Sequence, residues 1–462
     1  MDMATATNQA ANQAKAGQDI SDADDSLRET FIPLTKSALQ RRLTTAAAWP
    51  NGDHAAAKKF FQYLDHWRRQ NYNNGLREID QDYEEFSPDT DLLDTRSHTI
   101  SELEGMKQRI TAHMAHLLKH ANYVQIDPKQ VEMILTRESF YGLDLHVDLS
   151  AFEDLMIYYR GASTKKELRR VPKKFYRKVE FEVPIYRRLF MLFKIKPYDV
   201  RVAEVMASEK VSKNEARRMV TKLRKSLPEG IDCNLIYMKM FKNMPCSDIE
   251  MIFPNTAVKF RLLDKLKLGL TSSAGLGMGA FGAAGKIALA ATNPLAAAGA
   301  VAGLGSVAVR QGVAFMNQRQ KYMVVMAQNL YFHALADNRG VMIKLADRAA
   351  EEDVKEEMLL YGVLAKTTVN RRDLEHVDNA IERFLKSTFE IDVNFDLSEA
   401  LERLIADGIV TEDTDGNLQT LSPAAAAKHI DHKWDGFLDT LVEDKDDLGV
   451  EVDTATEAQR PA

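Results

Sequence analysis

The sequence predicts an α+β protein: a helical N-terminal region, a small mixed α/β middle domain, a two-helix membrane hairpin and a C-terminal winged-helix-like domain. Three observations predict this order. Apolar residues recur at three- and four-residue spacing toward both ends of the chain. Strict alternation and β-branched or aromatic runs occupy the middle. A stretch of 42 residues, 268–309, is rich in Gly and Ala and carries one charge, Lys286.

Length and composition indicate globular material with more than one core. The chain has 462 residues, 45% hydrophobic and 28% charged, with a formal net charge of -6. A chain of this length exceeds one ordinary core, so several domains are expected. The small net charge excludes a general attraction to nucleic acid or acidic lipid, and any such attraction must be local. Residues 1–27 are expected to be a disordered tail, neither a secretory signal nor a transit peptide.

The sequence offers no pattern for a metal or a cofactor. Cys233 and Cys246 lack the CxxC spacing of a zinc site and are expected to be buried thiols in a reducing compartment. His113, His116 and His120 share one helix face, but no acidic or Cys partner stands at a suitable spacing. We therefore predict no metal and no cofactor.

The N-terminal region, residues 28–140, is predicted to be helical. Its first helical stretch carries an apolar stripe and ends at Ser87-Pro88-Asp89; the stripe consists of Phe60, Phe61, Leu64 and Trp67. A second amphipathic helix is expected over residues 99–122, and Asp127-Pro128 is typical of a further helix start.

The middle domain, residues 141–257, changes to a period of two. LDLHVDL alternates, and DLMIYYRG and KVEFEVPI are rich in aromatic and β-branched residues, which predicts strands. Between residues 165 and 196 twelve Lys or Arg stand against three Glu. This basic face either contacts anionic lipid or is an ordinary solvated surface; the candidates for lipid contact are Lys165, Lys166, Arg169, Arg170, Lys173 and Lys174.

Residues 268–309 are long enough for two membrane spans of about 20 residues each. Gly275 with Gly279, and Gly299 with Gly303, form GxxxG pairs that let two helices pack closely in lipid. Basic residues flank both ends, which places both ends on one side of the membrane. The alternative is a buried hairpin of small residues outside any membrane, because Gly and Ala supply little hydrophobic transfer energy.

The C-terminal part, residues 320–430, is predicted to hold two long helices, over 320–335 and 341–364, and then a winged-helix-like domain. One helix carries the stripe Leu374, Val377, Ile381, Phe384 and Leu385. Asp396 or Ser398 caps the next helix, Gly408 ends it, and Asp415-Gly416 is the turn of a β-hairpin. Residues 445–462 are expected to be disordered.

The third helix of this domain argues against DNA binding. It carries Glu399, Glu402 and Asp407 against Arg403 alone, and phosphate contacts need the opposite sign. A protein-docking winged helix is the better interpretation, and no nucleic acid is expected as a partner.

Two acidic groups need an interpretation. Asp248 and Glu250 could be paired carboxylates for acid or base chemistry, but no nucleophile or metal site accompanies them. The favoured interpretation is that Asp248 caps a helix after Pro245. The acidic run between residues 347 and 357, interleaved with Arg348 and Lys355, is predicted to be a solvated helix face.

Several local patterns together resemble the transmembrane protein 143-like family, whose members carry a domain of unknown function numbered 3754. The matching stretches are RETFIPL at Arg28 to Leu34, YEEFSPDTD at Tyr83 to Asp91, FEDLMIYYRG at Phe152 to Gly161, MFKNMPCSDIEMIFPNT at Met240 to Thr256, LLDKLKL at Leu262 to Leu268 and NLYFHALADNRGVMIKLADRAAEEDVKEEMLLYG at Asn329 to Gly362. The resemblance implies a membrane protein without an assigned reaction.

The sequence predicts a membrane-anchored scaffold or adaptor, in preference to an enzyme, with its soluble domains on one side of the bilayer. The expected partners are membrane lipid and a protein. A bacterial inner membrane with cytoplasmic domains is the expected location, in preference to a mitochondrial membrane. The alternative is a membrane-associated enzyme acting on a lipid or lipid-linked substrate, with Asp248 and Glu250 as its candidate catalytic residues; a DNA-binding regulator is third.

Overall fold

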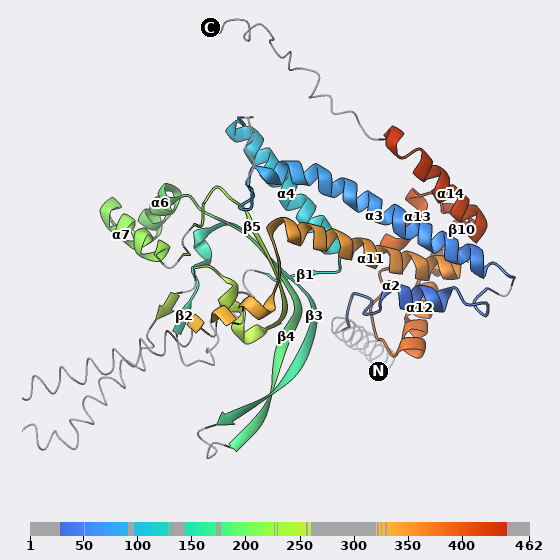
Figure 1. The fold of residues 1–462 in the computed structure, drawn as a ribbon, viewed down its shortest axis with the longest axis horizontal. Coiled ribbons are helices and arrows are strands. Elements are labelled where there is room, and N and C mark those ends of the chain that lie inside the picture. The colour runs from blue at the N-terminus through green and yellow to red at the C-terminus, as the bar shows by residue number, and fades with distance from the viewer. Residues whose placement is uncertain are drawn as a thin grey trace, which may run out of the picture. The chain divides into compact units, whose positions relative to one another are not determined.

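The fold is that of a computed structural model, in which two compact units are each built from separated segments (Figure 1). Unit 1 comprises Met1–Ile32, Tyr72–Glu352 and Asp392–Asn394, and unit 2 comprises Pro33–Asn71, Asp353–Ile391 and Phe395–Ala462. The structure describes residues 28–49, 51–90, 97–127, 131, 144–171, 177–225, 227–228, 230–255, 257–259, 320, 323–324, 326–328 and 330–440.

An antiparallel five-stranded sheet in the order β1-β3-β4-β5-β7 forms the centre of unit 1. Its strands are β1 (Val124–Gln125), β3 (Phe152–Val171), β4 (Arg177–Ile195), β5 (Tyr237–Pro245) and β7 (Ala334–Asp337). A separate pair joins β2 (Asp144–His146) to β6 (Ala257–Lys259). The predicted strands of the middle domain are therefore confirmed, whereas β7 lies at the end of a segment predicted to be helical.

Both faces of strand β4 are buried. Successive side chains of a strand point to opposite faces of the sheet, so neighbouring residues of β4 enter different cores. Phe190 and Leu192 pack in one core cluster, and Leu189, Met191 and Phe193 pack in another. This explains the unbroken apolar run in the middle of β4.

Helices cover the first of these faces. Their apolar residues join the cluster of Phe190 from α3 (His54–Glu84), α4 (Ile100–His120) and α11 (Asn338–Leu364). Helix α4 begins where predicted, because the side chain of Thr99 accepts from the backbone amide of Glu102 and Glu102 binds back to the amide of Thr99. On the other face the short helix η3 (Cys246–Ile252) contributes Ile249 and Ile252.

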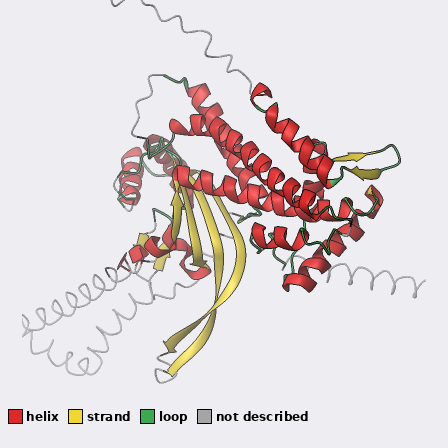
Figure 2. Ribbon diagram, turned by 45° about the vertical axis from the view of Figure 1, so that its right-hand side comes forward, coloured by secondary structure: helices red, strands yellow, loops and turns green. Residues whose placement is uncertain are grey.

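The far part of β3 and β4 extends beyond the rest of the sheet (Figure 2). The two strands pair from Phe152 with Ile195 to Val171 with Arg177, whereas β4 pairs with β5 only as far as Ile185. Among the described strands, nothing else pairs with the section from Thr164 to Pro184. We call this two-stranded section the β3–β4 ribbon.

A helical pair lies at the end of β4 in unit 1. It consists of α6 (Tyr198–Glu209) and α7 (Lys213–Arg224), which share a small apolar cluster of Val202, Val205, Ala216 and Val220. The short helix η1 (Leu149–Ala151) precedes β3.

Unit 2 is mostly helical. Its elements are α2 (Lys36–Leu43), the residues of α3 before Tyr72, the residues of α11 from Asp353, β8 (Val369–Asn370), η4 (Arg371–Asp373), α12 (Leu374–Phe389), α13 (Leu397–Ala406), β9 (Val410–Glu412), β10 (Asn417–Thr420), α14 (Pro423–Asp435) and η5 (Leu438–Thr440). The buried Tyr361 packs against Trp49, Phe60 and Phe61.

The C-terminal part of unit 2 has the predicted order of helices followed by a β-hairpin. Its sheet has the order β8-β10-β9, and in the sequence α12 and α13 lie between β8 and β9. This is the connectivity of a winged helix. Asp396, and not Ser398, caps α13 by accepting from the amide of Glu399. Gly416 has a φ of 81° at the hairpin turn.

Gly408 supports a specific prediction about the end of α13. Its φ is 75°, and a Cβ atom there would lie 3.1 Å from Nε2 of His429. We expect Gly408→Ala to lower the free energy of unfolding by about 1–2 kcal/mol, since a side chain in the left-handed region costs that much. Tryptophan fluorescence in urea measures this in unit 2, because Trp49, Trp67 and Trp434 are the three tryptophans of the chain and all belong to unit 2.

Gly436→Ala is the matched control. Gly436 has a negative φ of -84°, and a Cβ atom there would meet only the backbone oxygen of His432, at 3.9 Å. The substitution should therefore change the stability little. Equal losses for the two variants would contradict the role of the left-handed conformation.

The predicted fold class needs one correction. In the part of the chain that the structure describes, no helix is long and apolar enough to cross a membrane. The described residues form a mixed α and β fold, and the predicted membrane hairpin is not supported. Residues 268–309, with Gly275, Gly279, Gly299 and Gly303, lie outside the described residues. The prediction rested on the length of this stretch and its single charge. Gly and Ala contribute little transfer free energy, so these two features alone do not identify a membrane-spanning segment.

Candidate functional site

Asp248 and Glu250 lie in η3, directly after β5. Both are buried, at 6% and 7% exposure, and Ile249 between them packs in the apolar core. Burial, with the negative charge of Asp248 as a further cause, raises the pKa of the Glu250 carboxyl to about 7. The residue that caps η3 is Pro245, without a side-chain hydrogen bond, so the predicted capping role of Asp248 is not observed.

A carboxyl group with a pKa near 7 can take up or release a proton under physiological conditions. Catalysis also requires contact with a substrate, and neither Asp248 nor Glu250 lines the cavity found at the end of β4. Their assignment as catalytic residues stays a prediction.

The basic candidates lie in the β3–β4 ribbon. Four of them are in β3, where the backbone register pairs Lys165 with Val183, Lys166 with Glu182, Arg169 with Val179 and Arg170 with Lys178. Lys173 and Lys174 fall outside the described residues. By sequence, residues 165–178 contain eight Lys or Arg and one Glu.

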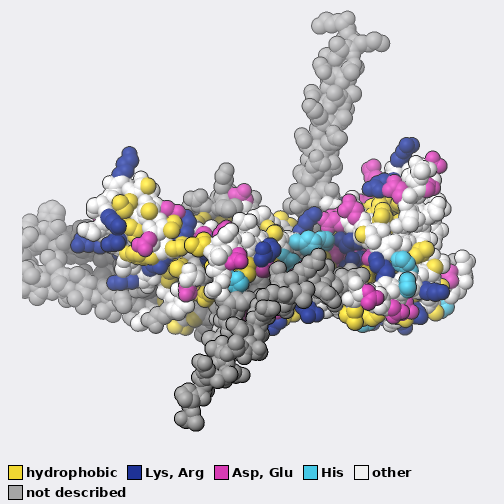
Figure 3. All heavy atoms as spheres, turned by 90° about the horizontal axis from the view of Figure 1, so that it is seen from above, with side chains coloured by type: hydrophobic (Ala, Val, Ile, Leu, Met, Phe, Trp, Pro, Cys, Tyr) yellow, Lys and Arg dark blue, Asp and Glu magenta, His cyan; other side chains and the backbone are white. Residues whose placement is uncertain are grey.

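One face of the described surface has a mixed charge pattern. Acidic and basic side chains are interspersed over the face shown in Figure 3. Such a mixture produces no strong field of one sign, as the net charge of -6 suggests.

The three histidines lie on α4 as predicted. The rings of His116 and His120 are 4.3 Å apart between centroids, and those of His113 and His116 are 6.3 Å apart. Gly75 of α3 leaves room for His113, whose pKa is lowered by burial. Among the residues described, no group of three or more His, Cys, Asp or Glu side chains is placed to hold a metal ion.

The acidic run on α11 is exposed at Asp347 and partly exposed at Glu351, and the prediction of a solvated face was wrong for its other four acids. Glu352, Asp353, Glu356 and Glu357 are at most 5% exposed. In unit 1, Glu352 forms an ion pair with Arg160 and accepts from the backbone amide of Ile32.

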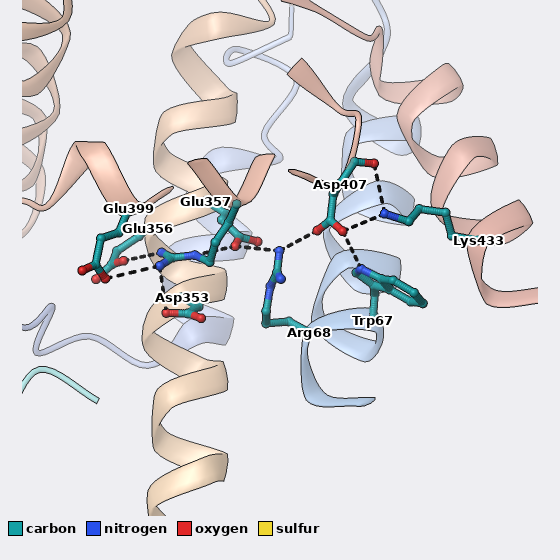
Figure 4. Close-up of polar contacts among 9 residues, drawn as sticks. Trp67, Arg68, Asp353, Glu356, Glu357, Glu399, Asp407 and Lys433 are labelled. Carbon is teal, nitrogen blue, oxygen red and sulfur yellow. Dashed lines mark hydrogen bonds and ion pairs between the residues drawn. The ribbon is translucent and has the colours of Figure 1, made fainter. Parts of the chain in front are cut away.

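The other three carboxylates, which Figure 4 labels, form ion pairs with Arg403 of α13 within unit 2. The guanidinium binds Glu356 at 2.6 Å, Glu357 at 2.8 Å and Asp353 at 3.3 Å. Burial alone would lower the pKa of Arg403, but these carboxylates outweigh it and raise that pKa. Arg403 is therefore a charged, buried partner of α11 and is not available to bind phosphate from α13.

A second arginine extends this network. Arg68 of α3 binds Glu357 at 2.9 Å and Asp407 at 2.6 Å, and Asp407 also accepts from the indole of Trp67 and from Lys433 (Figure 4). Burial raises the pKa of Asp407, but Arg68 and Lys433 outweigh it and hold that pKa below the usual value.

The network contains five carboxylates and three cations. Its carboxylates are Asp353, Glu356, Glu357, Glu399 and Asp407, and its cations are Arg68, Arg403 and Lys433. Burial raises the pKa of the fully buried Glu357 despite both arginines. The arrangement joins α3, α11, α13 and α14 and presents no open site for chemistry.

Sequence reasoning missed a set of polar residues around a cavity in unit 1, above all Arg201 and Asn255. Both carry a buried polar atom without a hydrogen-bond partner among the described residues. No short motif marks them, because they come from segments far apart in the chain.

Comparison with known proteins gives one family match. Residues 152–340, from β3 to the first residues of α11, match the family described as "Protein of unknown function (DUF3754)". No solved structure matches the chain. The match does not test the transmembrane protein 143-like name. It shows that residues 152–340 form a domain of unknown function.

Proposed function

We propose that the chain is a scaffold or adaptor protein whose β3–β4 ribbon binds an anionic lipid surface. The observation that carries the proposal is the ribbon. Its two strands leave the sheet and pair only with each other among the described strands, and the section from Thr164 to Pro184 has eight basic residues against three acidic ones. This surface contact does not require a membrane-spanning segment.

Electrostatics supports a charged surface as the partner. Each Lys or Arg near an anionic bilayer contributes about 1 kcal/mol, so four such residues give about 4 kcal/mol. The sequence that joins the two strands, Pro-Lys-Lys-Phe-Tyr, adds two aromatic residues to the basic ones. Aromatic side chains favour the headgroup level of a bilayer, which favours lipid over a purely polar anion.

The C-terminal winged helix supports the adaptor part of the proposal. The exposed residues of α13 are Ser398, Glu402 and Ala406, and its one arginine is bound to α11. An acidic, small-residue face repels phosphate, so we propose a protein as the partner of this face.

The experiment uses the full chain with phosphatidylcholine vesicles, with and without phosphatidylserine. Binding should occur only with the anionic vesicles and weaken as salt rises, because exposed charges are screened. Replacing Lys165, Lys166, Arg169 and Arg170 by Gln should weaken binding by about two to three powers of ten.

The control neutralises four exposed cations elsewhere, Arg41, Arg42, Lys58 and Lys59, and should bind as the unchanged protein does. Equal binding to both kinds of vesicle, or an equal loss in both variants, would overturn the lipid proposal. Tighter binding of single-stranded RNA than of anionic vesicles would assign the ribbon to nucleic acid instead.

An enzyme acting on a lipid or a lipid-linked molecule is the second candidate. The pKa of Glu250, near 7, favours it. Hydrolysis or transfer of a lipid substrate that Glu250→Gln abolishes, while vesicle binding persists, would establish this candidate. The transmembrane protein 143-like relationship is likewise a proposal that rests on the stretches of sequence quoted above.

A further inference from the structure

The helices α6 and α7 form a helix–turn–helix in unit 1. Each has 12 residues, and only Lys210, Val211 and Ser212 lie between them. Lys210 has a left-handed φ of 52°, which turns the chain, and Val211 packs against the apolar cluster that the two helices share. The hydroxyl of Ser212 accepts from the backbone amide of Glu215 and caps α7. A turn of three to four residues between two packed helices is the connection of DNA-binding helix–turn–helix motifs.

Contacts on one side of α7 hold it to the rest of unit 1. Ala216 and Val220 are buried in the cluster shared with α6. Near the end of the helix, Arg224 donates to the backbone carbonyl of Lys196 at 2.6 Å and lies over the ring of Tyr198, 5.3 Å from its centroid. The helix is therefore fixed through this side, which leaves its opposite side for a partner.

The opposite side of α7 is basic. Four exposed residues recur there at three- and four-residue spacing, so they share one face: Asn214, Arg218, Lys222 and Lys225. Among the described residues, no acidic side chain forms an ion pair with the three cations. By sequence, residues 213–225 contain six Lys or Arg and one Glu. Lys and Arg side chains project at the left end of the face in Figure 3, the end at which Figure 1 places α6 and α7.

Charge and residue type favour duplex DNA as the partner of this face. Exposed cations without acidic partners displace the counterions that surround DNA, and Arg and Asn are the side chains that read guanine and adenine in the major groove. With its side chains an α-helix is about 10–12 Å wide, which fits a groove of about 12 Å. A bilayer is less favoured, because the face carries no aromatic residue of the kind found at the headgroup level.

We infer that α7 docks in the major groove of duplex DNA, with Asn214 and Arg218 toward the base edges and Lys222 and Lys225 toward the phosphates. In helix–turn–helix motifs the N-terminal part of the second helix contacts the bases, which gives Asn214 and Arg218 this role. The acidic helix that argued against DNA is α13 of unit 2, so α7 is a separate surface. The inference does not depend on the β3–β4 ribbon or on lipid.

The test is fluorescence anisotropy of the full chain with a mixed-sequence DNA duplex of about two helical turns. The duplex should bind, and binding should weaken steeply as salt rises. Duplex RNA of the same sequence should bind at least about tenfold more weakly, because its major groove is too narrow for side chains to read. No binding of the DNA, or equal binding of the RNA, would overturn the inference.

A triple variant locates the binding on α7. Replacing Arg218, Lys222 and Lys225 by Gln changes only exposed positions, and circular dichroism should show an unchanged fold. The DNA affinity should fall at least about tenfold. The slope of log affinity against log salt should shrink by about two, since each of the two phosphate contacts contributes about 0.9. DNA affinity that survives these substitutions would refute the site.

The matched control is the ribbon variant, in which Lys165, Lys166, Arg169 and Arg170 are replaced by Gln. It loses one more positive charge than the α7 variant and should keep the DNA affinity of the unchanged protein. The α7 variant should in turn bind anionic vesicles as the unchanged protein does. Equal losses of DNA binding in the two variants would show a response to net charge alone and refute the site. Loss of vesicle binding but not of DNA binding in the α7 variant would assign the face to lipid instead.

Discussion

Replacing Arg403 by Ala should lower the free energy of unfolding of unit 2 by about 3–5 kcal/mol, because it strands three buried carboxylates without their main cation. Glu356, Glu357 and Asp353 contact its guanidinium, and all three are at most 5% exposed. Urea unfolding monitored by tryptophan fluorescence measures the loss in unit 2. The loss should shrink in acid, since protonation neutralises the stranded carboxylates.

Arg371→Ala is the control for this prediction. Arg371 also lies in unit 2 and pairs with Glu412, but its side chain is 50% exposed. Exposed ion pairs contribute at most about 1 kcal/mol, so this variant should change stability little. If Arg403→Ala cost no more than Arg371→Ala, the buried network would not stabilise unit 2.

Glu250→Gln should raise the stability of unit 1 by about 3 kcal/mol at pH 8 and leave it nearly unchanged at pH 4. The pKa of Glu250 is about 7 in the folded chain against an ordinary value of 4.5. The folded state therefore holds the proton more tightly, and its stability falls as pH rises from about 4.5 to 7. Gln imitates the protonated carboxyl and removes this loss.

Hydrogen exchange of the β5 amides measures this prediction, because β5 directly precedes η3. Protection in the unchanged protein should fall between pH 4.5 and 7 after correction for intrinsic exchange, and the variant should show no such fall. Glu209→Gln, at an exposed position of α6, serves as the control. A destabilised Glu250→Gln protein at pH 8 would show that the ionised carboxylate is the stabilising form.

Local structure was the part of the fold that the sequence predicted well. Thr99 with Glu102 starts α4, Asp396 starts α13, and Asp415-Gly416 turns the last hairpin, each by contacts within a few residues. Such contacts depend on short spacing, so a pattern of residues reveals them. The strands of the middle domain were recognised for the same reason, since alternation is a local property.

The partners of buried charges were not predictable from spacing. Glu352 and Arg160 are 192 positions apart, and Arg403 and Glu356 are 47 apart. From the sequence alone a carboxylate on a helix is expected to be solvated, because the arginine that pairs with it lies in a distant part of the chain. The same holds for the cavity, where Asn255 meets Asp148 across 107 positions. Strand β7 was missed because four residues carry no period of their own.

The positions of the candidate site residues in the fold were not predicted. Residues 165–170 lie outside the stretches whose pattern predicted strands, and the structure has them in β3. The burial of Asp248 and Glu250 could not be foreseen, because it results from packing of η3 against the sheet of unit 1.

Strand β7 also has a consequence for how this chain tolerates change in length. It pairs with β5 through Lys239 with Asp337 and Met240 with Ala336, so the sheet is completed by a strand that lies far along the sequence from its partner. Loop-closure entropy grows only with the logarithm of length, and each doubling costs about 0.6 kcal/mol. Insertions or deletions between β6 and β7 are therefore thermodynamically cheap for the sheet.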